Sequence, residues 1–513
     1  MIQDKLAFRY HEAFNMKTPI SGVTKMDLAS LVKDKSLIRT NAYINGEFVK
    51  ATNGAEFDVT NPVDGAVVAS VADCGADMMK AAIDAAEAAQ PAWAAKTAKE
   101  RAAIMRKWYD LCMENADDLA IILTAEMGKP LAEAKGEIGY GSSFIEWFAE
   151  QAKRVQGEVL ESPFGDKKFL TLRQPVGVFA AITPWNFPNA MITRKVAPGI
   201  AVGCACVLKP AEQTPLSALA LAELAHRAGI PAGIINIIPG MDAPALGGMM
   251  CEDDRVRKIT FTGSTEVGRI LMRQSADTIK KISLELGGNA PLIVFDDADL
   301  DEAVEGAIAS KYRNAGQTCV CANRVFVQAG IYDKFAAALA EKVAAMKVGN
   351  GFDEGVVQGP IIDEQGFEKV KRHVSDALDK GAQIVTGGKA HEMGGTFFEP
   401  TVITGATSDM ELYSEETFGP VAALFKFETE EDVIKSANDT IFGLAAYYFT
   451  KDVGRIFRVG EALEYGMVIA NTGAYSSEVG PFGGVKASGL GREGSVHGVD
   501  EFLEMKLMVV GGI

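Results

Sequence analysis

The feature that most constrains how this chain can fold is a regular alternation of short apolar runs with helical segments, which begins at Val176. Each apolar run is only a few residues long and a helical stretch follows it, so the pattern predicts parallel βαβ units with right-handed crossovers. The predicted strands are residues 176–182, 206–208, 234–238, 258–261, 282–284 and 292–295. The predicted helices between them include residues 216–227 and 266–274. This region is therefore expected to form a doubly wound parallel sheet.

The same alternation returns between residues 303 and 449 and predicts a second α/β domain with a doubly wound parallel sheet. Its predicted strands are residues 325–327, 383–385, 421–427 and 445–449. Upstream, residues 77–153 are rich in Ala, Met and Glu at helical spacing, which predicts amphipathic helices at 81–92 and 98–115. A chain of 513 residues exceeds what one hydrophobic core usually supports, so two or three packed units fit its length.

Two further segments are predicted to be strands outside these domains. Residues 157–173 are interrupted at Pro163 and are expected to form a hairpin, and residues 503–510 near the end of the chain are strand-like. Protruding strands leave unpaired edges that often pair with another subunit. We therefore expect a small β hairpin for oligomerisation and a homo-oligomer, either a dimer or a tetramer.

The composition excludes several classes of protein. A net charge of −17 argues against a nucleic-acid-binding protein, and no apolar run reaches the roughly 18–20 residues that span a bilayer. The first 35 residues contain neither an apolar signal core nor an acid-free, Arg-rich transit pattern, so a cytoplasmic location is expected. The seven cysteines lack disulfide-scaffold spacing and the five histidines lack ligand spacing, so no metal site is expected.

The strongest candidate nucleophile is Cys319, in the run NAGQTCVC of residues 314–321. This run follows a helix-like stretch, residues 301–312, and contains a glycine, so the cysteine is expected on a loop. A thiolate attacks carbonyl carbon readily, and loops on rigid frameworks commonly carry such groups. The alternative is a small buried apolar residue, which is the commonest fate of a free cysteine.

A candidate base is Glu285, which stands in the run SLELGGN among residues suited to a buried strand. Burial disfavours the charged form of a carboxylate, and this suits it to act as a base on water near neutral pH. The glycine pair that follows allows close approach of backbone or ligand. The alternative is a strand residue whose side chain points outward into solvent.

A candidate oxyanion donor is Asn186, in the run ITPWNFP at the carboxyl end of a predicted parallel strand. Ligands bind at that end of open α/β sheets, and an amide there can stabilise a carbonyl that becomes tetrahedral. Prolines on both sides make the segment rigid. The alternative is a rigid turn whose asparagine only caps the next helix.

Two more strand ends have features of a nucleotide site. The run FTGSTEVG, residues 261–268, leads from a strand into a helix, and the helix start with the Ser264 hydroxyl suits a pyrophosphate. The run KPAEQTP, residues 209–215, supplies Lys209 and Glu212, which could bind the two hydroxyls of an adenosine ribose. The alternatives are a generic Gly-rich turn for the first and a solvated loop for the second.

Taken together and in this order, the motifs ITPWNFP, KPAEQTP, FTGSTEVG, LELGG, GQTC, EETFGP and PFGGVKASGLGREG resemble the aldehyde dehydrogenase superfamily, from about residue 41 to the end of the chain. The resemblance implies that Cys319 is the nucleophile, that Asn186 and the Cys319 amide stabilise the oxyanion, and that Glu285 is the base that releases the acid. It also implies a set of cofactor-binding residues, namely Trp185, Lys209, Glu212, Gly240, Gly263, Ser264, Gly268, Glu416 and Phe418.

The domain organisation expected from this resemblance has four parts. Residues 1–35 form an N-terminal extension, which is expected to be irregular or loosely helical. Residues 36–155 and 176–286 form the NAD(P)-binding domain, and residues 287–482 form the catalytic domain. Residues 156–175 and 483–513 are the oligomerisation segments.

Within the superfamily, the chain is most similar to succinate-semialdehyde dehydrogenases. The run KYRNAGQTCVCANR contains Arg313, the run ITRK contains Arg194, and the run NTGAYSSEVG contains Ser476. The resemblance implies that these residues hold the far carboxylate of an ω-carboxy aldehyde, which needs charge-assisted partners in an apolar tunnel. The alternative for the two arginines is structural ion pairing. Glutarate semialdehyde, one methylene longer, is the alternative substrate.

The expected cofactor is NAD, with NADP as the alternative. The acid at Glu212 should bind the 2′-hydroxyl of NAD and repel the 2′-phosphate of NADP. Cys321 is a candidate redox partner, because similar enzymes with a CVC run can form a reversible disulfide at the nucleophile; its alternative role is packing.

Two other functional classes remain to be considered. A catalytically silent protein on the same fold would lack the nucleophile or the base, and both are present. A CoA-acylating or phosphorylating aldehyde enzyme would pass the acyl group to a different acceptor, and CoA-dependent families usually lack the base at the position of Glu285, which disfavours that class.

Overall fold

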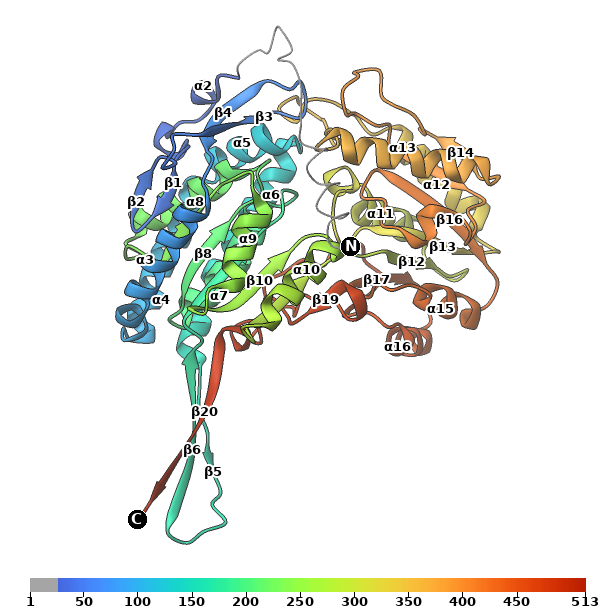
Figure 1. The fold of residues 1–513 in the computed structure, drawn as a ribbon. Helices are drawn as coiled ribbons and strands as arrows, with labels where there is room; N and C mark the ends of the chain where they lie inside the picture. The colour runs from blue at the N-terminus through green and yellow to red at the C-terminus, as the bar shows by residue number, and fades with distance from the viewer. Residues whose placement is uncertain (1–25) are drawn as a thin grey trace, which may run out of the picture.

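The computed structural model describes residues 26–513, and Figure 1 shows two halves that each contain a large sheet with its own helices. The predicted α/β fold with two parallel-sheet domains is confirmed. The predicted N-terminal extension lies mostly outside the described residues; its last part contains the short helix α2 (Leu28–Leu31). No helix within residues 26–513 has the length and apolar character needed to cross a membrane.

The first sheet has eight strands in the order β19-β11-β10-β7-β8-β9-β1-β2. The strands are β1 (Ala42–Ile44), β2 (Glu47–Val49), β7 (Val178–Ile182), β8 (Ala205–Lys209), β9 (Ile235–Ile237), β10 (Val256–Thr262), β11 (Lys281–Glu285) and β19 (Gly489–Leu490). Strands β7 to β11 are parallel, and the order runs outward from β7 in one direction and from β10 in the other. A topological switch point therefore lies between β7 and β10, which is where open α/β sheets bind ligands.

The helices of the first half connect and cover these strands. They are α3 (Ala76–Ala94), α4 (Ala98–Glu114), α5 (Ala116–Met127), α6 (Leu131–Gln151), α7 (Ala190–Ala201), α8 (Pro215–Ala228), α9 (Ala243–Glu252) and α10 (Thr265–Ala276). Local sequence sets several of their ends. A capping box between Thr97 and Glu100 begins α4, and Gly128, with a left-handed φ of 85°, ends α5.

The second sheet has seven strands in the order β14-β15-β16-β13-β12-β17-β18. The strands are β12 (Ala290–Val294), β13 (Ala322–Gln328), β14 (Gln383–Thr386), β15 (Thr401–Thr404), β16 (Val421–Phe427), β17 (Ala445–Phe449) and β18 (Met467–Ala470). All pairs are parallel except β14 with β15. The accompanying helices are α11 (Leu300–Lys311), α12 (Tyr332–Ala344), α13 (Glu364–Asp379), α14 (Glu411–Ser414), α15 (Glu430–Asn438) and α16 (Val453–Ala462).

A three-stranded antiparallel sheet projects away from both halves (Figure 1). It consists of β5 (Val159–Leu160), β6 (Lys167–Pro175) and β20 (Leu503–Gly511), and it contains the predicted hairpin. Most residues of β20 are exposed, including apolar ones such as Leu507 at 56 % and Met505 at 60 %. A separate two-stranded ribbon is formed by β3 (Glu56–Thr60) and β4 (Val67–Ala72).

Candidate active site

A cavity of about 850 Å³ is lined by residues from both halves of the molecule. From the first half come the segments that follow β7 and β10, at the switch point of the sheet. From the second half come the loop around Cys319, the first part of α13, and the loop that joins α14 to β16. Of the predicted site residues, seven line this cavity: Trp185, Asn186, Gly263, Ser264, Cys319, Glu416 and Phe418.

Cys319 lies on a loop, as predicted, and its side chain is partly exposed to the cavity. The loop begins with a 3₁₀ turn (Arg313–Gly316) in which Asn314 and Ala315 have φ values of 54° and 53°. Non-glycine residues with positive φ are strained and persist only where neighbours hold them. Here Glu133 Oε2 accepts a hydrogen bond of 2.9 Å from the Asn314 main-chain N–H.

The thiol of Cys319 is largely protonated at rest. Burial raises its pKa to about 12, the Arg194 cation lowers it, and the carboxylates of Glu416 and Glu285 raise it further. A thiolate must therefore form as the reaction proceeds, because only the thiolate is strongly nucleophilic.

Asn186 is held beside the Cys319 loop by its main chain and its side chain. The side-chain Nδ2 of Asn186 donates a hydrogen bond to the main-chain carbonyl of Gln317 at 3.0 Å. The main-chain carbonyl of Asn186 accepts a hydrogen bond from Asn314 Nδ2 at 3.0 Å. A side-chain amide carries two hydrogens, so one hydrogen remains for an oxyanion in the cavity.

A buried ion pair that sequence reasoning missed supports the same residue. Lys129 Nζ lies 2.6 Å from Glu137 Oε2 and donates to the Asn186 carbonyl at 2.7 Å. Glu137 Oε1 in turn accepts from the Asn189 main-chain N–H at 2.9 Å. The sequence carries no clear signal for this pair, because Lys129 and Glu137 look like the exposed charged residues that surround them, and only the fold shows that they are buried together.

Glu285 ends β11 and is 2 % exposed. Neither of its carboxylate oxygens has a hydrogen-bond partner among residues 26–513. Burial raises the pKa of this carboxyl well above its usual range, and the Glu493 carboxylate adds to the effect. Glu285 does not line the cavity itself, but the two residues that follow it, Leu286 and Gly287, do. A buried carboxyl without partners is costly, and such groups cluster at functional sites.

Arg194 lies on α7, is fully buried, and does not line the cavity. It forms an ion pair with Glu493, which also pairs with Lys195. Its guanidinium carbon lies 3.9 Å from the centre of the Phe482 ring. This arrangement favours the structural-ion-pair alternative for Arg194.

Arg313 is in a different environment. It is partly exposed, its guanidinium carbon lies 5.0 Å from the centre of the Phe187 ring, and it forms no ion pair with any residue that the structure describes. Ser476 is also partly exposed, and neither residue lines the 850 Å³ cavity. Arg313 is therefore the better placed of the two arginines to receive an anion.

The cofactor side of the cavity has features that fit a dinucleotide. Ser264 caps α10, whose N-terminus faces the cavity and suits a phosphate. The rings of Trp185 and Phe418 meet edge to face at 5.6 Å, and the volume is typical of cofactor sites. Burial raises the pKa of Glu416 to about 7, and its Oε1 accepts from the Gly288 N–H at 3.1 Å.

Four predicted cofactor residues lie outside this cavity. Lys209 and Glu212 form an ion pair at 3.2 Å. Gly240 and Gly268 have packing roles, because a Cβ would lie 2.6 Å from the Cys74 carbonyl oxygen at the first and 2.5 Å from Leu286 at the second.

Cys321 is buried, two residues after Cys319 on the same loop. Its Sγ donates to the Lys311 carbonyl at 3.5 Å, and both cysteines are free thiols. These contacts favour the packing role, and the redox role stays a prediction.

The chain is similar to known proteins over most of its length. The model of the aldehyde dehydrogenase family matches residues 48–508. Succinate-semialdehyde dehydrogenase [NADP(+)] of Escherichia coli is 60% identical over 480 residues, covering 94% of this chain and 99% of that protein. Glutarate-semialdehyde dehydrogenase of Pseudomonas putida is 58% identical, covering 93% and 99%. The crystal structure of succinate-semialdehyde dehydrogenase from Burkholderia pseudomallei has a TM-score of 0.93 at 58% identity, covering 94% and 99%. The chain thus belongs to the aldehyde dehydrogenase family.

Proposed function

We propose that this protein oxidises succinate semialdehyde to succinate with NAD or NADP, through a thioester on Cys319. The observation that carries the proposal is that Cys319 and Asn186 line one cavity, while the buried carboxyl of Glu285 stands directly before Leu286 and Gly287, which line the same cavity. Relatives that cover nearly the whole chain carry this activity in their names. Steady-state kinetics with a panel of ω-carboxy aldehydes tests it, and succinate semialdehyde should give the highest kcat/KM.

In the first half-reaction, the partly exposed thiol of Cys319 passes its proton to solvent, and its sulfur bonds to the aldehyde carbon while the carbonyl π electrons move to the oxygen. The former carbonyl oxygen becomes an oxyanion, which accepts hydrogen bonds from Asn186 Nδ2 and the Cys319 main-chain N–H. A nicotinamide bound here would supply the acceptor for the hydride that leaves this carbon. Trp185, Glu416 and Phe418 would hold that side of the cofactor, and Ser264 its pyrophosphate.

In the second half-reaction, the Glu285 carboxylate takes a proton from water. The hydroxide carbon–oxygen bond forms as the carbon–sulfur bond breaks, which releases the acid and regenerates the sulfur of Cys319. Two covalent steps replace one difficult step. A carboxyl whose pKa is raised by burial suits this task near neutral pH.

We expect Arg313→Ala to raise the KM for succinate semialdehyde by about 10- to 100-fold, the size of a lost charge-assisted hydrogen bond. The KM for an uncharged aldehyde such as butanal should change little. Arg194→Ala should instead impair both substrates and lower the melting temperature, because it leaves Glu493 buried with one partner fewer. Equal losses for both aldehydes in Arg313→Ala would remove its role as the carboxylate ligand.

For the cofactor, we expect a higher kcat/KM with NAD than with NADP, because Glu212 repels a 2′-phosphate. Lys209 forms an ion pair with that carboxylate and offsets part of its negative charge. The preference for NAD should therefore be moderate, and both dinucleotides should be used. Glu212→Gln should shift the ratio toward NADP. A strong NADP preference in the parent enzyme would contradict this assignment.

The alternative substrate is glutarate semialdehyde, which a relative from Pseudomonas putida carries in its name. One methylene changes binding by only about 1–3 kcal/mol, so the two aldehydes must be compared directly.

We also propose that the protein assembles as a dimer or tetramer through the projecting sheet, because β20 exposes a row of apolar side chains along an unpaired edge.

A further inference from the structure

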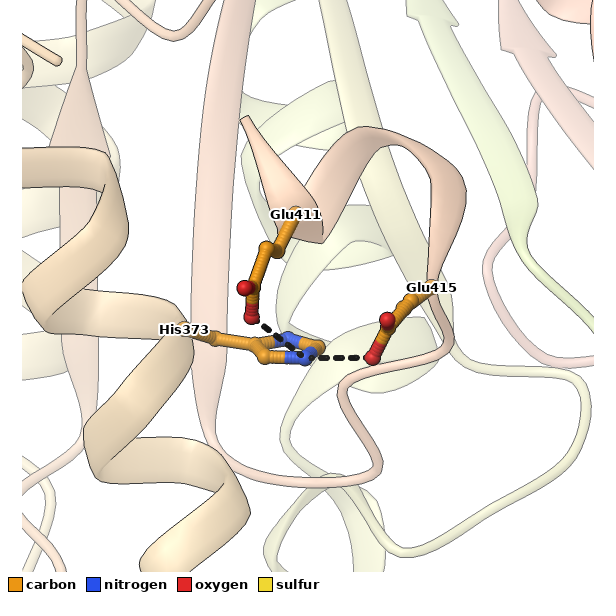
Figure 2. Close-up of side chains that lie close together, drawn as sticks. All are labelled: His373, Glu411 and Glu415. Atoms are coloured by element: carbon orange, nitrogen blue, oxygen red, sulfur yellow. Dashed lines mark hydrogen bonds and ion pairs between the residues drawn. The ribbon is translucent and has the colours of Figure 1, made fainter. Parts of the chain in front are cut away.

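His373 on α13 is a fully buried histidine that the proposed reaction does not use. Its imidazole ring lies against the segment of residues 415–418, which we call the nicotinamide loop. Figure 2 shows the carboxylates of Glu411 and Glu415 directed at the ring. The buried imidazole therefore has a polar neighbour at each of its two ring nitrogens.

The ring contacts the nicotinamide loop at two points. Its Nδ1 lies 3.2 Å from Thr417 Oγ1, and its Nε2 lies 3.2 Å from Glu415 Oε2. Burial lowers the pKa of His373, which favours the neutral ring at neutral pH. In the neutral tautomer that satisfies both contacts, Nε2–H donates to Glu415 and Nδ1 accepts from the Thr417 hydroxyl.

His373, Glu411 and Glu415 are also the residue types that bind divalent metals. However, Arg372 already supplies a cation to the same carboxylates. Its Nε lies 2.8 Å from Glu411 Oε2, and one Nη lies 2.9 Å from Glu415 Oε2 and 3.4 Å from His373 Nε2. A metal would have to displace this guanidinium, so the cluster is better explained as an internal network.

The nicotinamide loop needs support from α13, because its backbone is strained. Phe418 has a φ of 56°, which a non-glycine residue adopts only when its surroundings impose it. At the next residue, a Cβ on Gly419 would lie 2.3 Å from Val370 Cγ2, so α13 packs directly against the backbone there. Val370 and His373 are three residues apart on α13 and therefore lie on the same face. They hold the loop on either side of Phe418.

The held residues are those that face the cofactor. Glu416, Thr417 and Phe418 all line the cavity, and Phe418 contacts Trp185 across it. We propose that His373 is a positioning residue, which fixes the nicotinamide loop through Thr417 and so sets the affinity for the dinucleotide. This inference rests on the proposed function, because it assumes that a dinucleotide occupies the cavity.

The test measures the Kd of NAD and NADP by calorimetry, per mole of folded protein, in the full-length enzyme. His373→Leu should raise the Kd of both dinucleotides about 3- to 10-fold, the size of one neutral hydrogen bond. Thr417→Val should give a similar increase and keeps the experiment informative if His373→Leu folds poorly. The double variant should be no weaker than the worse single variant, because both changes remove the same contact. His373→Gln, which keeps a donor and an acceptor, should recover part of the loss.

Ser375→Ala is the matched control, since Ser375 is an exposed side chain on the same helix and should leave the Kd unchanged. Unchanged Kd values in folded His373→Leu and Thr417→Val would overturn the role of His373 and leave the proposed function intact. Additive losses in the double variant would also overturn it. If the parent enzyme bound neither dinucleotide, the proposed function would fail, and the inference would fail with it.

Discussion

Replacing Cys319 by alanine is expected to abolish dehydrogenase turnover, with kcat reduced by at least about three orders of magnitude. The substitution removes one sulfur atom from a partly exposed side chain on the wall of the cavity, so the fold and the cofactor site should persist. What is lost is the atom that bonds to the aldehyde carbon. Formation of NADH or NADPH at 340 nm measures the effect.

Cys321→Ala is the matched control for this experiment. Cys321 lies two residues further along the same loop, but it is buried and donates to the Lys311 carbonyl. The control variant should therefore keep most of the turnover, although its stability should fall slightly because a small cavity is created. Comparable activity in Cys319→Ala and the parent enzyme would reject the assignment of the nucleophile.

Glu285→Gln is expected to separate the two half-reactions. Glutamine has nearly the same shape but cannot take a proton from water, so the thioester should form and then persist. We expect a rapid burst of about one NADH or NADPH per active site, followed by a steady state about 10²- to 10⁴-fold slower than in the parent. Stopped-flow absorbance resolves the two phases.

The pH dependence follows from the same groups. The working forms are the Glu285 carboxylate and the Cys319 thiolate, and burial raises the pKa of both. Deprotonation of both groups increases with pH, so kcat and kcat/KM of the parent should rise as the pH is raised through neutrality. In Glu285→Gln, the rate of the slow phase should no longer show the increase with pH that comes from deprotonation of the Glu285 carboxyl.

Glu126→Gln is the control, because it also removes a buried carboxyl group, but one that has no role in the proposed reaction. Burial raises the pKa of Glu126 to about 8, but both of its oxygens accept main-chain hydrogen bonds at the start of α8. This variant should have a lower melting temperature and no burst. A burst in Glu126→Gln, or none in Glu285→Gln, would contradict the role of Glu285.

The sequence predicted the central strands well for a physical reason. Strands β7 and β8 are buried along their length, so they appear as short apolar runs with a glycine before them and a proline after them. Strands β15 and β18 were not predicted. Each has only four residues, and β15 begins and ends with threonine, so neither carries a distinctive pattern.

The candidate site was predictable to the extent that its residues lie in local motifs at strand ends. Asn186 and Ser264 line one cavity because they follow the adjacent parallel strands β7 and β10, whose carboxyl ends share one edge of the first sheet. Cys319 reaches the same cavity from the second half, on the loop that precedes β13. The partners of those residues were not predictable. Arg194 pairs with Glu493 across 299 positions, and only the tertiary fold brings them together.

The measurement that tests the central claim most directly is peptide mass spectrometry of Glu285→Gln, quenched with acid within the burst phase in the presence of succinate semialdehyde and NAD. We expect a succinyl group on the peptide that contains Cys319, labile to hydroxylamine as a thioester should be, and absent when the dinucleotide is omitted. Formation of NADH with no acyl group on Cys319, or with the acyl group on another residue, would contradict it.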